Sequence, residues 1–306
     1  MSSIPCTMIR TALMVVFLAV CAPPAPGQSG KEIERSITEA APAEAFVKSK
    51  KPRKLLVFTL TRGFRHASIP VGARALEILG AKSGAFEVTR SDDISLLEPE
   101  AIEGFDAICL LNTTGELLLP PKMEELPEEE QAAARERGRR LRKSLLDFVS
   151  GGKGLIGIHA ATDCLYGFPE FGRLIGGYFD GHPWHEVVTV KLDEPGHPVN
   201  APFAGEAFEI KDEIYQFRAP YSRERQRVLL SLDTARTDMK KKGIHRDDDD
   251  FAVSWVRRHG KGRVFYCSLG HRDEIFWNPR VLRHYLAGIQ YALGDLPCED
   301  TPQSGP

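Results

Sequence analysis

The sequence predicts an α/β fold in which a mainly parallel, doubly wound sheet carries helices on both faces and continues into an antiparallel extension. In the first half, continuous apolar runs of strand length alternate with amphipathic helical segments, a pattern typical of parallel sheets covered on both sides. In the second half, strand-like runs follow one another without helices between them. The chain has 306 residues, 42% of them hydrophobic, so it can bury a large core in one domain or in two small ones.

The first half contains four predicted strands. They are expected at 54–60, 86–93, 106–114 and 153–158. The apolar face of 69–84 predicts a helix that ends at Gly84. A second, longer helix is expected to end at 151–152; its acidic residues come early and its basic residues late, which suits the helix dipole.

The second half closes the predicted sheet. Strands are expected at 184–193, 206–217 and 227–234, followed by a hairpin over 251–271 that turns at 259–262. The segment 278–294 has a helical pattern and completes the domain.

Residues 1–27 have the three-part pattern of a secretory signal peptide. A basic residue precedes an apolar run of about ten residues, too short to span a bilayer, and small residues precede the expected cleavage point at Gln28. We therefore expect an exported protein, periplasmic or extracellular, without a transmembrane span. A lipoprotein lipidated at Cys21 fits less well, because Val20 stands where a small residue is expected.

The remaining chain is divided by composition. Residues 28–52 are polar and weakly periodic, and we interpret them as a linker. The domain is expected over 53–295, and 296–306 form a C-terminal tail. The formal net charge of -2 and the absence of a basic stripe exclude nucleic acid as an expected partner. The sequence has no Walker A loop, GxSxG elbow or HExxH motif.

Three predicted strands lead to a histidine at or shortly after their carboxyl ends: His66, His159 and His271. In open α/β sheets, ligands bind beyond these strand ends. We therefore expect the three histidines to share one crevice, although any one of them alone is more often a hydrogen-bonded structural residue.

Further candidates flank the same strand ends. His182 and His185 are three residues apart on either side of Trp184, and imidazole suits zinc or another divalent metal. Two histidines do not complete a metal site, so a structural role is equally open to them. A divalent metal such as zinc is the one cofactor that we expect.

Other polar residues could bind a substrate. On a strand, Glu213 and Tyr215 point to the same face, which would place a carboxylate beside a phenol. Arg62 and Arg65 could hold a polyhydroxylated or anionic ligand through their forked donors. Asp163 follows His159 closely and is included with them, as is Trp184, which adjoins His185.

Five segments taken together resemble the ThuA-like family, named for trehalose utilisation: VFTLTRGFRHAS, GKGLIGIHAATD, GYFDGHPWHE, DEIYQF and VSWVRRHGKGRVFYCSLGH. The resemblance covers about 53–295. It implies a three-layer, flavodoxin-like fold of the class I glutamine amidotransferase type. True amidotransferases carry a cysteine at the elbow after a central strand, where this chain has His159. An imidazole cannot form the thioester with glutamine, so glutaminase activity is not expected.

The resemblance also implies a role in disaccharide or glycoside catabolism, alongside sugar oxidoreductases that produce 3-keto glycosides. We expect a small sugar substrate and isomerisation, elimination or hydrolysis of a keto-sugar glycoside, by acid/base or metal-assisted chemistry. The expected catalytic residues are His159, His66, His271 and Glu213. Two alternatives stay open: a carbohydrate-binding domain without catalysis, and a metal-dependent hydrolase of another substrate.

Overall fold

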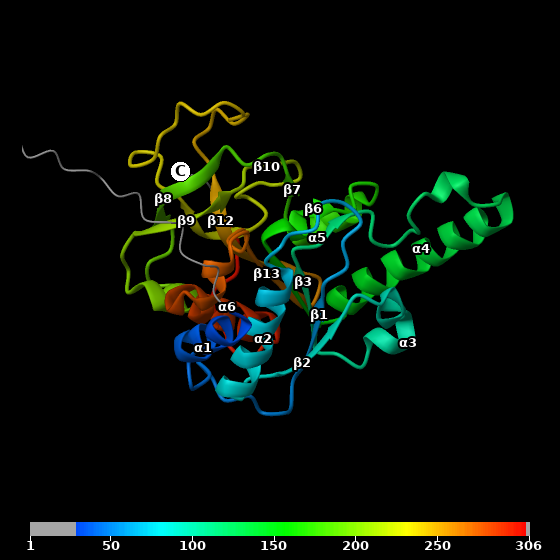
Figure 1. The fold of residues 1–306 in the computed structure, drawn as a ribbon, viewed down its shortest axis with the longest axis horizontal. Helices are drawn as coiled ribbons and strands as arrows, with labels where there is room; N and C mark the ends of the chain where they lie inside the picture. The colour runs from blue at the N-terminus through cyan, green and yellow to red at the C-terminus, as the bar shows by residue number, and fades with distance from the viewer. Residues whose placement is uncertain (1–28, 304–306) are drawn as a thin grey trace, which may run out of the picture.

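The computed structural model describes residues 29–303, and its centre is a nine-stranded mixed sheet (Figure 1). The strand order is β2-β1-β3-β5-β13-β12-β11-β8-β9. Five strands form the parallel half: β2 (Glu87–Ser91), β1 (Lys54–Phe58), β3 (Ala107–Leu111), β5 (Gly154–Ile158) and β13 (Gly262–Cys267).

The other half of the sheet is antiparallel. It consists of β12 (Ala252–His259), β11 (Arg227–Leu232), β8 (Trp184–Leu192) and β9 (Phe208–Ile214). Two small two-stranded sheets lie outside it: β4 (Thr114–Gly115) with β6 (Asp163–Cys164), and β7 (Tyr178–Phe179) with β10 (Phe217–Arg218). The predicted fold class is therefore confirmed, including the antiparallel extension.

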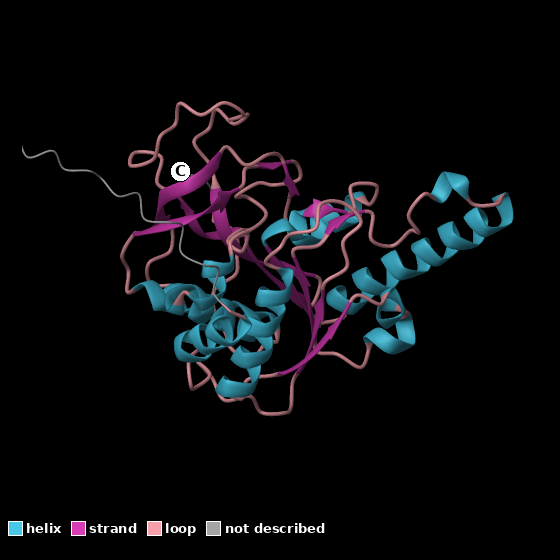
Figure 2. Cartoon of the chain, viewed as in Figure 1, coloured by secondary structure: helices cyan, strands magenta, loops and turns pink. Residues whose placement is uncertain are grey.

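Helices cover both faces of the sheet, so the fold has three layers (Figure 2). On one face lie α1 (Gly30–Ala40), α2 (Ile69–Ser83) and α6 (Pro279–Ala292); on the other lie α3 (Pro99–Ile102), α4 (Glu128–Ser150) and α5 (Pro169–Ile175). Alternate residues of β1 show the two faces: Leu55 and Val57 belong to one core, Leu56 and Phe58 to the other. Burial on both sides explains why these strands are continuous apolar runs.

Short 3-10 helices complete the chain. They are η1 (Ile94–Leu97), η2 (Met123–Glu125), η3 (His159–Thr162), η4 (Pro198–Phe203) and η5 (Asp273–Trp277). Two of them, η3 and η5, follow strands of the parallel half at their carboxyl ends and carry or adjoin the histidines discussed below.

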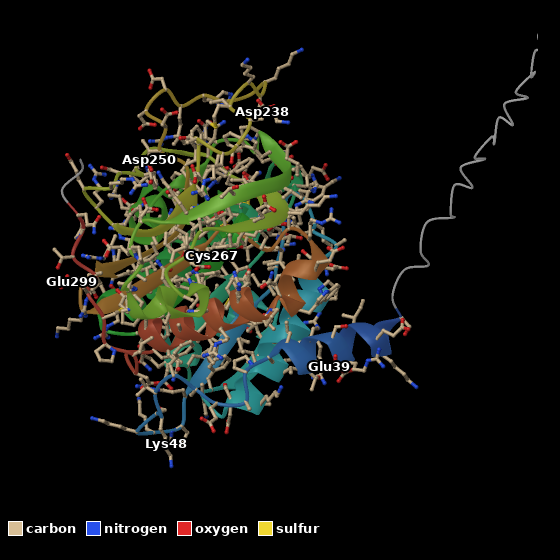
Figure 3. All side chains as sticks on the ribbon, turned by 90° about the vertical axis from the view of Figure 1, so that its left-hand side faces the viewer. Glu39, Lys48, Asp238, Asp250, Cys267 and Glu299 are labelled. Atoms are coloured by element: carbon tan, nitrogen blue, oxygen red, sulfur yellow. The ribbon has the colours of Figure 1, made fainter. Side chains whose placement is uncertain are left out.

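The segment 28–52, expected to be a linker, is in large part docked on the domain. Ser29 and Glu32 form a capping box that starts α1, and Ile37 is fully buried between this helix and the core. Further on, Gln290 of α6 hydrogen-bonds to the backbone of Phe46 and Val47. α1 packs against α2 and η5 (Figure 3). The polar composition of this segment did not predict the docking, because a helix can pack one face on a domain with only a few apolar residues.

The two ends of the predicted domain are followed by a segment on each side, and the structure describes only part of them. The predicted signal peptide, 1–27, lies outside the described residues. In the predicted tail, Asp300 accepts a hydrogen bond from Tyr291 of α6, and Leu296 is buried, so this segment also packs on the domain. Among residues 29–303, no helix has the length and apolar character needed to cross a membrane.

The contact between α6 and β13 depends on a residue without a side chain. A methyl group at Gly288 would overlap the ring of Phe265. We predict that Gly288→Ala lowers the free energy of unfolding by about 1–3 kcal/mol, because an overfilled core forces its neighbours to move. Urea denaturation monitored by circular dichroism measures this.

Gly196→Ala is the matched control. A methyl group at Gly196 meets no atom within 4 Å, so its free energy of unfolding should stay within about 0.5 kcal/mol of the wild type or rise slightly. Equal stability of the two variants would show that α6 does not pack this closely on the sheet.

Candidate functional site

Three histidines meet at the carboxyl ends of the parallel strands. His66 lies in the loop after β1, His159 directly follows β5, and His271 lies in the loop after β13. Their ring centroids are 4.9 Å apart for His66 and His159, and 5.3 Å apart for each pair that includes His271. The structure therefore brings together the three strand-end histidines in one place, as the strand order suggested.

His159 is held in a single orientation. Its φ of 50° lies in the left-handed region, which is uncommon for a residue with a side chain and marks a sharp turn out of β5. Its Nδ1 is 2.6 Å from the carbonyl oxygen of Ser268. A carbonyl only accepts, so Nδ1 carries the proton and Nε2 presents its lone pair, 3.0 Å from the hydroxyl of Tyr215.

Small residues around this turn leave room for the imidazole. A methyl group at Gly157 would lie 2.8 Å from the ring of Tyr266, and one at Gly270 would lie 3.2 Å from Cβ of His159. The phenol of Tyr266 also donates a hydrogen bond to the carbonyl oxygen of His159 at 2.7 Å. The elbow expected from the sequence is therefore present, with an imidazole at its tip.

Glu213 of β9 joins the cluster from the antiparallel half. Its Oε2 is 3.4 Å from Nε2 of His159 and 3.2 Å from Nδ1 of His271, while its Oε1 is 3.4 Å from Nδ1 of His182. Burial opposes ionisation of this carboxyl, but the imidazoles of His159 and His271 beside it lower its pKa below the usual range. The hydrogen bond with Glu213 in turn raises the pKa of His271, against the effect of burial.

The neighbouring carboxylate, Asp212, holds the loop that carries His271. Asp212 is fully buried and accepts backbone hydrogen bonds from Gly270 at 2.7 Å, His271 at 3.3 Å and Arg272 at 3.0 Å. Strand alternation puts Asp212 on the face of β9 opposite Glu213. The local sequence pattern does not indicate that the loop after β13 covers this face, so the role of Asp212 is not predicted.

A second pair of polar residues supports the same loop. The hydroxyl of Ser68 donates to the carbonyl oxygen of Gly270 at 3.0 Å. The side-chain amide of Asn112 donates to the hydroxyl oxygen of Ser68 at 3.0 Å and to the carbonyl oxygen of Gly270 at 3.1 Å. All three atoms are buried in the described part of the molecule. The loop after β13 is thus fixed from the β1, β3 and β9 sides.

The cluster has the donor set of a metal site. One ligand atom each of His66, His159, Glu213 and His271 lies within 4.8 Å of the other three. In a tetrahedral zinc site with bonds of about 2.1 Å, ligand atoms are about 3.4 Å apart. The Nδ1 atom of His66 is buried and has no hydrogen-bond partner among the described residues, whereas Nδ1 of His271 faces Oε2 of Glu213.

The protonation of His66 also fits a ligand role. Burial, reinforced by the neighbouring imidazoles, lowers the pKa of His66 to about 3. Its ring is therefore neutral at pH 7, with a lone pair free for a metal ion. Buried nitrogens without partners are unfavourable unless something binds them, and a divalent cation would satisfy them.

Neither histidine assigned to a metal from the sequence belongs to this group. His182 is half exposed in the loop before β8, and its ring faces the outer oxygen of Glu213. His185 is exposed on β8 opposite Glu213, with its ring centroid 4.7 Å from that of His271. Both histidines therefore lie beside the cluster and are not part of it.

The expected substrate-binding residues lie in different places. Arg62 and Arg65 are exposed on the loop that carries His66. Asp163, half-buried, accepts a hydrogen bond from the hydroxyl of Tyr166 at 2.6 Å, and burial raises its pKa. Tyr215 points into the cluster, as its alternation with Glu213 predicted.

Trp184 requires a correction, because it is a core residue rather than a substrate-binding residue. It is fully buried, its ring packs edge-on against Phe251, and its Nε1 donates to the carbonyl oxygen of Asp238 at 2.8 Å. Its side chain alternates with that of His185 along β8, so the two point to opposite faces.

Aromatic side chains that the sequence analysis did not single out surround the entrance to the cluster. Phe64 is 66% exposed and its ring stands edge-on to His66 at 4.8 Å. Tyr166 is also exposed, and Phe179 packs on Tyr215 at 4.5 Å. Exposed aromatic rings beside a polar site are a signal for ligand binding, but a single sequence does not show which ones are exposed.

The comparisons with known proteins show the family and agree with the fold. The family model described as ThuA, trehalose utilisation, matches residues 54–292. A ThuA-like protein from Bacteroides uniformis has a similar fold: 22% identity, a TM-score of 0.59, and coverage of 80% of this chain and 93% of that one.

A second solved structure is similar. It is a ThuA-like protein from Parabacteroides merdae, with 17% identity, a TM-score of 0.54, and coverage of 84% of this chain and 94% of that one. No functionally curated protein matches the sequence. Since the family model covers most of the chain, the protein belongs to the ThuA family, described by trehalose utilisation.

Proposed function

We propose that this protein is an exported enzyme of glycoside catabolism that acts on keto-sugar glycosides by metal-assisted acid/base chemistry. The observation that carries the proposal is the buried group of three histidines and a glutamate at the strand ends, in which Nδ1 of His66 has no partner among the described residues and Nε2 of His159 faces the phenol of Tyr215. The family's description, trehalose utilisation, supports a disaccharide as the parent sugar.

His66, His159, Glu213 and His271 would hold a divalent cation of the zinc type. Imidazole nitrogens with one carboxylate suit such ions, and the bond from Nδ1 of His159 to the carbonyl of Ser268 is the kind of support that fixes a ligand's tautomer. When bound, the ion would act as a Lewis acid toward a carbonyl or enolate oxygen of the sugar.

Tyr215 and His182 supply the proton transfers in this proposal. Burial raises the pKa of Tyr215 well above its ordinary value, so the phenol stays protonated and can donate to a developing oxyanion. His182 is half exposed and faces Oε1 of Glu213 at 3.4 Å, which would stabilise the imidazolium formed when His182 removes a proton.

The reaction balances as an elimination. A 3-keto group acidifies the proton on C2 of the sugar. His182 takes that proton, the C2–H electron pair forms the enolate, and the bond from C1 to the glycosidic oxygen then breaks. The leaving oxygen takes the proton that His182 holds, giving an unsaturated keto sugar and a free alcohol or second sugar and restoring the neutral imidazole. A sugar oxidoreductase must supply the 3-keto substrate, and we propose a functional link to such an enzyme.

The first prediction concerns the metal. Purified protein dialysed against zinc should retain about one ion per chain, measured by elemental mass spectrometry. Removing a residue that only orients a metal ligand typically weakens metal binding by about 10- to 100-fold. His159→Ala and His66→Ala each remove a ligand, so each should weaken zinc binding by more than that.

His185→Ala is the control for metal content, because His185 is exposed and outside the group. It should retain zinc as the wild type does. If His159→Ala retained zinc and His185→Ala lost it, the metal site would instead be the one expected from the sequence, at His182 and His185.

The second prediction concerns turnover. With 3-keto-trehalose as substrate, Tyr215→Phe and His182→Asn should each lower kcat by about 100-fold or more, the usual contribution of a positioned acid or base, while zinc content stays unchanged. Chelation of the metal should abolish turnover, and added zinc should restore it.

Other outcomes would favour the alternatives. Tight sugar binding with no turnover of any 3-keto glycoside would identify a carbohydrate-binding domain. Zinc-dependent cleavage of esters or amides, without action on 3-keto glycosides, would identify a metal-dependent hydrolase of another substrate. Either result would contradict the proposed reaction.

A further inference from the structure

A cavity of about 660 Å³ opens next to the histidine cluster. Its volume lies within the range of about 300–1,000 Å³ typical of small-molecule sites. His271 belongs both to the cluster and to the wall of this cavity. The remaining lining residues are Ile33, Ala67, Ser68, His185, Arg272, Asp273, Glu274 and Trp277.

Two elements outside the sheet contribute four of the nine residues that line this cavity. One is η5, which carries Asp273, Glu274 and Trp277. The other is α1, which contributes Ile33 and packs directly on η5. Figure 3 shows α1, marked by Glu39, at one edge of the molecule. This helix precedes the region 54–292 that the family model matches, so part of the wall lies outside the family's common domain.

The lining has the chemistry of a sugar-binding surface. Trp277 is half-buried and packs on the core with the rest of its ring, which leaves a rigid apolar face for the C–H side of a pyranose. Around it stand Arg272 and Glu274, paired at 3.3 Å, and Asp273. Their donors and acceptors suit hydroxyl groups, which need both.

We propose that this cavity binds the second sugar ring of a disaccharide while the ring to be cleaved lies at the histidine cluster, with Trp277 as the stacking platform. This inference rests on the proposed function and specifies its substrate as a disaccharide rather than a monosaccharide derivative. His271 marks the junction of the two positions, because it faces both.

The tryptophans of the chain give a direct readout. The sequence contains three, and all lie in the described region. Trp184 and Trp255 are fully buried, whereas Trp277 borders the cavity. A sugar that enters the cavity should therefore change the fluorescence of Trp277 alone.

The test uses the zinc-loaded protein and two sugars without a keto group, trehalose and glucose. Trehalose should change the tryptophan fluorescence and bind at least about tenfold more tightly than glucose, a difference of about 1.4 kcal/mol. In calorimetry, Trp277→Ala should bring the affinity for trehalose down to that for glucose.

Trp277→Phe is the matched variant, because it keeps an aromatic ring and the packing on the core. It should bind trehalose within about threefold of the wild type in calorimetry and show no fluorescence change. A fluorescence change that persists in Trp277→Phe, or none in the wild type, would overturn the inference, as would equal affinities for trehalose and glucose.

These results are separable from those on the reaction. If trehalose binds at Trp277 but no 3-keto glycoside is turned over, the cavity assignment stands and the proposed reaction fails. If 3-keto-trehalose is turned over with the same KM in wild type and Trp277→Ala, the reaction stands and the cavity assignment fails.

Discussion

The buried carboxylate of Asp212 is the contact on which the site depends. A buried charge is costly unless hydrogen bonds satisfy it, and Asp212 is satisfied by three backbone N–H groups of the loop after β13. In the sheet order three strands separate β9 from β13. The carboxylate therefore joins the far edge of the antiparallel half to the last strand of the parallel half, which is the middle strand of the whole sheet. Through this contact, Glu213 reaches the histidines.

Much of the fold and part of the site could be predicted from the sequence. The parallel strands are buried on both faces, which gives unmistakable apolar runs, and the strand-end rule then brought His66, His159 and His271 to one edge. Alternation along β9 placed Glu213 and Tyr215 on one face. These predictions rest on local periods and on one general property of parallel sheets.

The remaining features depend on contacts between distant segments. Asp212 is buried because another part of the chain covers it, and strand alternation carries no such information. Trp184 lies between two candidate histidines in the sequence, yet it points into the core. The docking of α1 depends on the face formed by α2 and η5, so its own polar composition was a poor guide.

The helix α1 separates two properties that are often linked in enzymes. The histidines and the glutamate stand on the sheet and its adjoining loops, whereas part of the wall of the neighbouring cavity, at Ile33, comes from a peripheral helix that packs on α2 and η5. Changes in α1 could thus alter which sugars fit without disturbing the residues that perform the chemistry. Relatives that differ in this helix would catalyse the same reaction on different sugars. Exchanging the helix between relatives would then change the substrate specificity.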